Sequence, residues 1–145
     1  MAETHRIFVA YCRDDVAIAG AVMTELKQAG AHVWAASSSL GQDWVDSIER
    51  GMADSSVFLQ IVTDNFLRSS WCTYELGFAL QLQRAGALTI VPVIVSDTTE
   101  RVPPTLSRKH ELIDGRGLKA STIADHVMDQ LKALPIPPLM ASAEA

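Results

Sequence analysis

The chain has 145 residues, of which 48% are hydrophobic and 20% are charged, and its net charge is −5. This length suits one domain with a sizeable core, and the composition is that of a globular protein. An acidic chain without a cluster of Lys or Arg lacks the basic surface that nucleic-acid binding requires.

Targeting and metal signals are also lacking in the sequence. The amino terminus is polar, and the longest apolar runs are too short to cross a bilayer. The two cysteines, Cys12 and Cys72, give neither a disulfide framework nor a metal-ligand spacing. We therefore expect a cytoplasmic protein with no metal, no membrane and no nucleic acid among its partners.

Apolar runs of strand length alternate along the chain with segments of helical spacing. The strands are expected at 6–12, 31–36, 56–63, 88–95 and 111–114, and the helices at 16–29, 43–52, 71–84 and 122–134. Strands that are apolar throughout are typical of a parallel sheet covered by helices on both faces. We predict a flavodoxin-like, three-layer α/β fold with a five-stranded parallel sheet in the order 2-1-3-4-5.

Three local signals refine this pattern. Asp14 or Asp15 is expected to cap the first helix. Pro92 lacks a ladder donor, so its strand is expected near an edge of the sheet or with irregular pairing. The proline-rich stretch after residue 134 ends the last helix, which predicts one domain over 1–134 and a Pro-containing tail or linker over 135–145.

The expected fold also indicates where a ligand would bind. In a sheet of this order, the cleft lies at the carboxyl ends of the first and third strands. Trp71 and Glu75 are four residues apart, so in a helix they would present a flat ring beside a carboxylate. The chain segments that reach this cleft carry Tyr11, Arg13, Trp44, Trp71 and Glu75. Taken singly, each has a structural explanation, as a core aromatic, a surface charge or an acid at a helix start.

Several segments together carry a family resemblance. They are Ile7-Phe8-Val9-Ala10-Tyr11 with Arg13-Asp14-Asp15, Val33-Trp34, Leu40-Gly41-Gln42-Asp43-Trp44, Ser56-Val57-Phe58-Leu59, Trp71-Cys72-Thr73-Tyr74-Glu75 and Val91-Pro92-Val93-Ile94. With these segments, residues 6–134 resemble a Toll/interleukin-1 receptor (TIR) domain of the bacterial type. The Trp-Cys-x-x-Glu segment is the most specific of them.

The resemblance implies an activity and a set of site residues. Some TIR domains cleave NAD between nicotinamide and ribose, some also cyclise the ADP-ribose, and others act only by assembling with one another. By resemblance, Glu75 is the catalytic residue, and the substrate-binding residues are Ala10, Tyr11, Arg13, Trp44 and Trp71. NAD+ is then a substrate, no cofactor is needed, and the partners are other TIR domains in a homo-oligomer or filament. We also expect a fused or separate sensor module and a role in bacterial defence or signalling.

The chemistry of the bond agrees with a single carboxylate. Nicotinamide leaves as a neutral molecule from a cationic ring, so its departure needs no general acid. A negative group near the developing oxocarbenium ion stabilises the transition state. Aromatic rings can stack on nicotinamide or adenine, and Arg13 can pair with phosphate. No glycine-rich phosphate loop follows the first strand, which argues against a hydride-transferring dehydrogenase.

Other interpretations remain open at this stage. A non-catalytic TIR scaffold is favoured by the segment after the second strand, where Ala35-Ala36-Ser37 stands in place of the acid common in the family. A nucleoside deoxyribosyltransferase-like enzyme would use similar glutamate chemistry on another N-glycoside. A reactive-thiol role for Cys12 or Cys72 lacks a base positioned by the sequence.

A phospho-acceptor receiver domain shares the predicted topology. It needs acids after the first and third strands, which Asp14, Asp15 and Asp64 would supply. It also needs a lysine after the last strand and close to the acids, and the nearest here is Lys119. This spacing disfavours a receiver domain.

Overall fold

A computed structural model of the chain describes residues 5–35, 55–68, 70–86, 88–95 and 112–133. The expected loop and helix over 37–52, with Trp44, and the tail after residue 134 lie outside these ranges. The elements are β1 (Arg6–Ala10), the 3-10 helix η1 (Arg13–Asp15), α1 (Val16–Gln28), β2 (His32–Ala35), β3 (Val57–Val62), α3 (Asp64–Arg68), α4 (Ser70–Arg84), β4 (Thr89–Ile94), β5 (Ile113–Asp114) and α6 (Ala120–Lys132).

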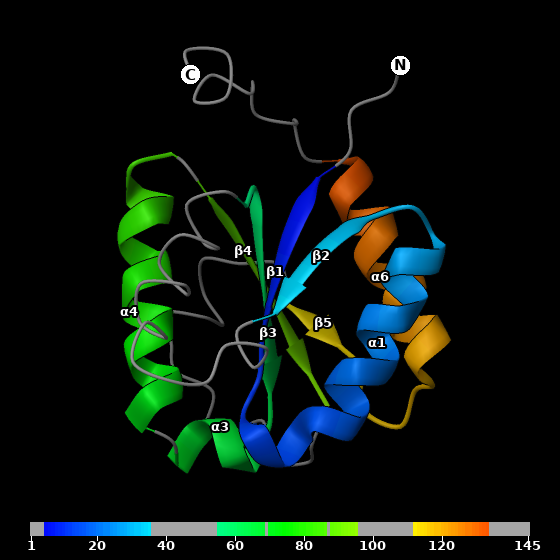
Figure 1. Cartoon of the computed structure of the whole chain (residues 1–145), viewed down its shortest axis with the longest axis horizontal. Helices are drawn as coiled ribbons and strands as arrows, with labels where there is room; N and C mark the ends of the chain where they lie inside the picture. The colour runs from blue at the N-terminus through cyan, green and yellow to red at the C-terminus, as the bar shows by residue number, and fades with distance from the viewer. Residues whose placement is uncertain (1–4, 36–54, 69, 87, 96–111, 134–145) are drawn as a thin grey trace.

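The strands form one parallel sheet whose order is β2-β1-β3-β4-β5 (Figure 1). This confirms the predicted flavodoxin-like order, in which β1 and β3 are neighbours at the centre. The strands were expected to be apolar on both faces, and β3 and β4 are buried over nearly their whole length. Burial of both faces follows from helices on both sides of the sheet.

The two faces of the sheet have different cores. On one face, α1 and α6 cover a cluster made entirely of aliphatic side chains, such as Leu59 and Val127. On the other face, α4 covers a cluster with aromatic rings, where Phe8 lies between Trp34 and Phe58 with ring centroids 5.0 and 5.5 Å away. Figure 1 shows α1 and α6 on one side of the sheet and α4 on the other.

Helix α6 illustrates how the sequence produces this packing. Its buried residues are Ile123, Ala124, Val127 and Leu131, a stripe with helical spacing. The rest of the helix is mostly exposed and polar. Helix α1 ends at Gln28, and Gly30, which was predicted to mark its end, follows the C-cap residue Ala29 with a φ of 98°, a conformation that favours glycine after a helix.

Pro92 was expected in a strand near an edge of the sheet or with irregular pairing, and, within the described residues, its strand is paired on only one side at this residue. Strand β4 is second from the edge of the sheet, and Pro92 is paired with Gln60 of β3. The short strand β5 pairs only with Val93 and Ile94. Among the described strands, the side of β4 facing β5 is therefore unpaired at Pro92, where the missing N–H costs no ladder bond.

None of the helices that the structure describes has both the length and the apolar character needed to span a bilayer.

Candidate functional site at the carboxyl edge of the sheet

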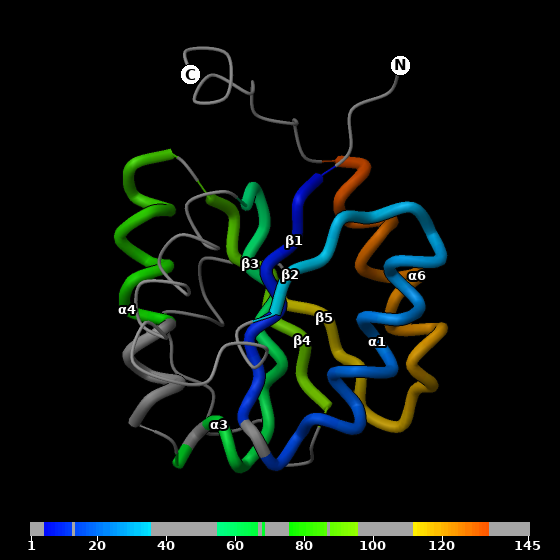
Figure 2. Tube along the Cα trace, in the orientation of Figure 1, coloured from blue at the N-terminus to red at the C-terminus, as the bar shows by residue number. Residues whose placement is uncertain are grey.

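The carboxyl ends of β1 and β3 lie side by side and send the chain in different directions. After β1 the chain enters η1 and α1, which pack on one face of the sheet. After β3 it enters α3 and then α4, which covers the other face (Figure 2). This is the topological switch point of the sheet, where open α/β folds bind ligands.

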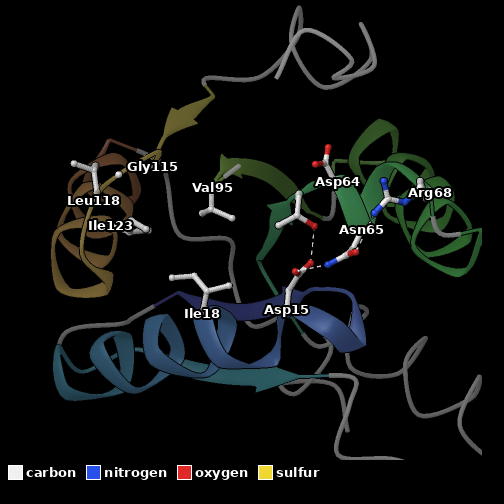
Figure 3. A pocket seen from close by; sticks show the side chains of 11 residues that line it. Asp15, Ile18, Asp64, Asn65, Arg68, Val95, Gly115, Leu118 and Ile123 are labelled. Atoms are coloured by element: carbon white, nitrogen blue, oxygen red, sulfur yellow. Dashed lines mark hydrogen bonds between the residues drawn. The ribbon is translucent and has the colours of Figure 1, made fainter. Parts of the chain in front are cut away.

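A buried carboxylate joins the two diverging segments. Asp15, which is only 9% exposed, accepts a hydrogen bond of 2.5 Å from Thr63 Oγ1 and one of 2.8 Å from Asn65 Nδ2 (Figure 3). Thr63 Oγ1 in turn accepts a bond of 3.1 Å from the backbone N–H of Phe66. The Thr63 side chain therefore caps α3 and ties it to the beginning of α1.

This network corrects one expectation from the sequence. Asp15 stands at the N-cap position of α1, but its side chain makes no capping hydrogen bond there. Its carboxylate instead accepts from Thr63 and Asn65 across the switch point. Capping by Asp14 or Asp15 was predicted from local sequence alone, and for Asp15 a tertiary contact 48 residues away has taken the place of the cap.

A cavity of about 500 Å³ opens beside this network. The side chains of Asp15, Asn65 and Arg68 lie on one side of it, and those of Leu118 and Ile123 lie on the other (Figure 3). The described residues that line it are Asp15, Ile18, Thr63, Asp64, Asn65, Arg68, Val95, Gly115, Gly117, Leu118 and Ile123. Ala10 and Tyr11, the two predicted substrate-binding residues whose side chains the structure describes, are not among them.

Of the predicted site residues, the structure places Ala10 and Tyr11 at the carboxyl end of β1, on opposite faces of the sheet. Ala10 is buried in the cluster under α4, whereas Tyr11 is half-buried and packs against the cluster under α1 and α6. The backbone of Arg13 begins η1, and the backbones of Trp71 and Glu75 lie in the first two turns of α4. The side chains of these last three residues, and all of Trp44, lie outside what the structure describes. Among the described segments, the turn after β1 and the turn after β3 therefore leave the sheet from neighbouring strands.

The sequence argument passed over a polar residue inside β3, two residues before the carboxyl end of that strand. Gln60 is completely buried in β3 and interrupts the otherwise apolar run VFLQIV. Its Nε2 donates to the carbonyl oxygen of Ala10 at 3.2 Å and to that of Ile61 at 3.1 Å. The amide within an apolar strand was a readable signal, since buried polar groups need partners. The partners of Asp15 gave no comparable signal, because they depend on the tertiary fold.

Of the acids that a receiver domain would need, Asp15 and Asp64 line the same cavity, whereas Asp14 does not line it. Asp14 is exposed, Asp15 is engaged with Thr63 and Asn65, and Asp64 lies in the first turn of α3. Lys119, the candidate lysine, precedes α6 and is exposed. Among the residues that the structure describes, no group of three His, Cys, Asp or Glu could hold a metal ion.

The sheet order and the helices on both of its faces define a flavodoxin-like α/β protein. The family model of the TIR domain matches residues 7–132, so the chain belongs to the TIR domain family.

A curated relative comes from Paracoccus denitrificans and is named NAD(+) hydrolase PdTIR. The two sequences are 29% identical over 114 residues, which are 74% of this chain and 38% of that protein. The match thus covers well under half the length of the relative.

A solved structure also resembles the chain. It contains the TIR domains of the activated Roq1 resistosome directly recognizing the pathogen effector XopQ, and it superposes with a TM-score of 0.58. The identity is 19%, over 90% of this chain and 74% of that one. At this identity the similarity shows a shared fold and nothing further.

Proposed function

We propose that this chain is an NAD+ glycohydrolase that cleaves the bond between nicotinamide and ribose, with Glu75 as its catalytic carboxylate. The observation that carries the proposal is the location of the Trp-Cys-x-x-Glu segment. Helix α3 follows the carboxyl end of β3, and α4 begins at Ser70, two residues after α3 ends, so the backbone of Glu75 lies in the second turn of the helix that follows this connection. Similarity to a protein named NAD(+) hydrolase supports the same substrate.

The proposed reaction requires little proton chemistry from the protein. As the glycosidic bond lengthens, the positive charge of the nicotinamide ring moves onto the ribose, and nicotinamide leaves neutral. The carboxylate of Glu75 stabilises this oxocarbenium-like charge. Water then adds to the sugar to give ADP-ribose, or an atom of the adenine ring attacks to give a cyclic isomer.

Substrate binding is assigned to the segments around Glu75. Arg13, in the turn after β1, pairs with the diphosphate, and the rings of Trp71 and Trp44 stack on nicotinamide or adenine. The substrate lies against Ala10, the last residue of β1, and against Tyr11, which follows it. NAD+ acts here as a substrate, and the reaction needs no other cofactor.

Self-association is the second part of the proposal. By the family resemblance, activity rises when several TIR domains form a homo-oligomer or filament and a neighbouring subunit completes the cleft. A sensor module, fused or separate, would trigger that assembly in bacterial defence or signalling. A non-catalytic scaffold that acts only by TIR–TIR contacts is the alternative.

The experiment is release of nicotinamide from NAD+ over a series of protein concentrations. We expect turnover per molecule to rise with concentration in the wild type. Glu75→Gln should lower kcat by about 100-fold or more, because the charge is lost while the side-chain shape is kept. Asp129→Asn is the matched control, since it removes an exposed carboxylate from α6 whose ion pair with Lys132 is 3.6 Å long.

Each alternative result has a definite reading. Equal turnover by the wild type and Glu75→Gln would refute the assignment of Glu75. No turnover by the wild type, even after artificial clustering on a scaffold, would leave the non-catalytic TIR scaffold as the better account.

A further inference from the structure

Gln60 is an unusual residue in the centre of the molecule. Its exposed fraction is zero, and side-chain alternation along β3 places it on the same face as Phe58 and Val62, in the layer under α4. Its neighbours in the sheet are Ala10 in β1 and Pro92 in β4. An amide at such a position loses its hydration and must find partners within the protein.

The amide finds partners for only one of its two ends. Nε2 donates to the carbonyl oxygens of Ala10 and Ile61. Oε1 is shielded from solvent and accepts no hydrogen bond from the described residues. The orientation of the amide follows from these contacts, because a reversed amide would place Oε1 against two carbonyl oxygens.

An acceptor buried without a donor lowers stability. An apolar side chain of similar length, such as methionine, would fill the same space without that cost. The two carbonyl oxygens would then lose one donor each, but each has a second lone pair for another bond. Stability alone therefore gives no reason for glutamine at this position.

The position of the bonded carbonyl supplies a reason. Ala10 is the last residue of β1, and its pairing with Gln60 is the last in the register between β1 and β3. The chain turns directly afterwards through Tyr11 and Cys12 into η1. The Gln60 side chain thus holds the main chain at the point where the proposed substrate-binding segment leaves the sheet.

We infer that Gln60 is a positioning residue for NAD+ binding, which fixes the direction of the 11–13 segment through the carbonyl oxygen of Ala10. This inference rests on the proposed function. Gln60 does not touch the substrate, because both of its polar ends are buried within the sheet layer. Its effect on the reaction passes through the main chain.

The test compares Gln60→Met with Ser56→Ala. Ser56 is a matched control because it is also a buried polar residue that bonds β1, at 3.0 Å from Oγ to the N–H of Arg6, but at the opposite edge of the sheet. Three properties are measured: the urea midpoint of unfolding, the exchange rates of the amides of residues 11–13, and kcat and KM for nicotinamide release. Gln60→Leu serves as a second variant in case methionine is not accommodated.

For Gln60→Met we expect an unchanged or higher urea midpoint and faster exchange of the 11–13 amides. KM should rise about tenfold with kcat nearly unchanged, because a loosened binding segment weakens the ground state and the transition state alike. Ser56→Ala should lower the urea midpoint and leave KM unchanged. Loss of folded protein alone lowers the apparent kcat and does not move KM, so the two roles are distinguished.

An unchanged KM together with a lowered urea midpoint in Gln60→Met would overturn the inference and make Gln60 a structural residue only. Unchanged amide exchange would overturn it as well. If the wild type releases no nicotinamide, the proposed function fails, and the exchange rates still decide separately whether Gln60 holds the end of β1.

Discussion

The amino ends of the central strands β1 and β3 differ from their carboxyl ends in the polar groups that lie there. At the amino edge, Ser56 Oγ accepts from the N–H of Arg6 and lies 3.0 Å from Nδ1 of His5, so a hydroxyl and a ring close the sheet without a formal negative charge. At the carboxyl edge, the buried carboxylate of Asp15 joins two turns, and a cavity opens beside it. At the amino edge, the described polar groups thus bond to neighbouring strand residues. At the carboxyl edge, a buried carboxylate joins two turns and lies beside a cavity.

This difference shows where a parallel sheet can place function. At the amino edge, the chain returns from the helices and enters the strands, and the polar side chains there bond to the backbone of a neighbouring strand. The carboxyl edge releases segments to opposite faces, so its side chains must hold diverging turns together. The following predictions test whether polar groups at the carboxyl edge have roles that those at the amino edge lack.

The largest effect is expected for Asp15→Ala. Removing the carboxylate leaves Thr63 Oγ1 and Asn65 Nδ2 without their acceptor in a buried site, which should lower the free energy of unfolding by about 3 kcal/mol. Urea denaturation measures this change. Asp14→Ala is the control, since Asp14 is the exposed neighbour and its loss should change stability by less than about 0.5 kcal/mol. Similar costs for both variants would mean that the network contributes little.

Ser56→Ala tests the amino edge and should cost about 2 kcal/mol. The N–H of Arg6 loses its side-chain acceptor, and the ring of His5 loses its partner Oγ. Thermal and urea unfolding report the loss. Nicotinamide release per folded molecule should stay at the wild-type value, and a selective loss of activity at full folding would contradict the division between the edges.

Gly115→Ala tests how closely the chain packs after β5. An added Cβ would lie 3.1 Å from the carbonyl oxygen of Ile94 and 3.2 Å from the side chain of Ile123, so the free energy of unfolding should fall by about 1 kcal/mol. Gly20→Ala is the matched control, because its Cβ meets nothing within 4 Å and α1 gains a better helix former. It should raise stability by up to about 1 kcal/mol. Equal shifts in both variants would contradict close packing at Gly115.

The smallest effect concerns Asp114 and depends on pH. Hydrogen bonds from the Arg116 side chain and backbone lower the pKa of Asp114 from 3.8 to about 2. A lowered folded-state pKa stabilises the protein above pH 4, and this contribution disappears as the pH falls towards 2. The stability difference between the wild type and Asp114→Asn should therefore be constant at neutral pH and shrink as the pH falls from about 4 through 2. Since both side chains are largely exposed, the difference should be small. A difference that does not change between neutral pH and pH 2 would exclude this origin.

Much of the fold was predictable because strand burial leaves a direct mark on the sequence. The apolar runs of β1, β3 and β4 and the stripe of α6 located these elements, and the sheet order then followed from right-handed crossovers. Strand β5 was expected over four residues and has two, Ile113 and Asp114, because so short a segment carries little periodic signal.

The sequence predicted where the candidate site lies in the fold, but not the hydrogen bonds within it. Sequence order brought the ends of β1 and β3 together, which placed Ala10 and Glu75 on segments that meet at one edge. The bonds of Asp15 to Thr63 and Asn65 were not predictable, since they join residues about 50 positions apart and displace a local capping role. Gln60 was readable as an anomaly in an apolar run, but its partner Ala10 follows only from the register of β1 and β3.

The most direct test of the functional carboxyl edge is an NMR titration of the Glu75→Gln variant with NAD+, in which binding is separated from turnover. We predict saturable shifts in the backbone amides of residues 10–13 and of the first two turns of α4, with none at Arg6 or Ser56 of the amino edge. Shifts confined to the amino edge, or none at millimolar NAD+, would contradict the account.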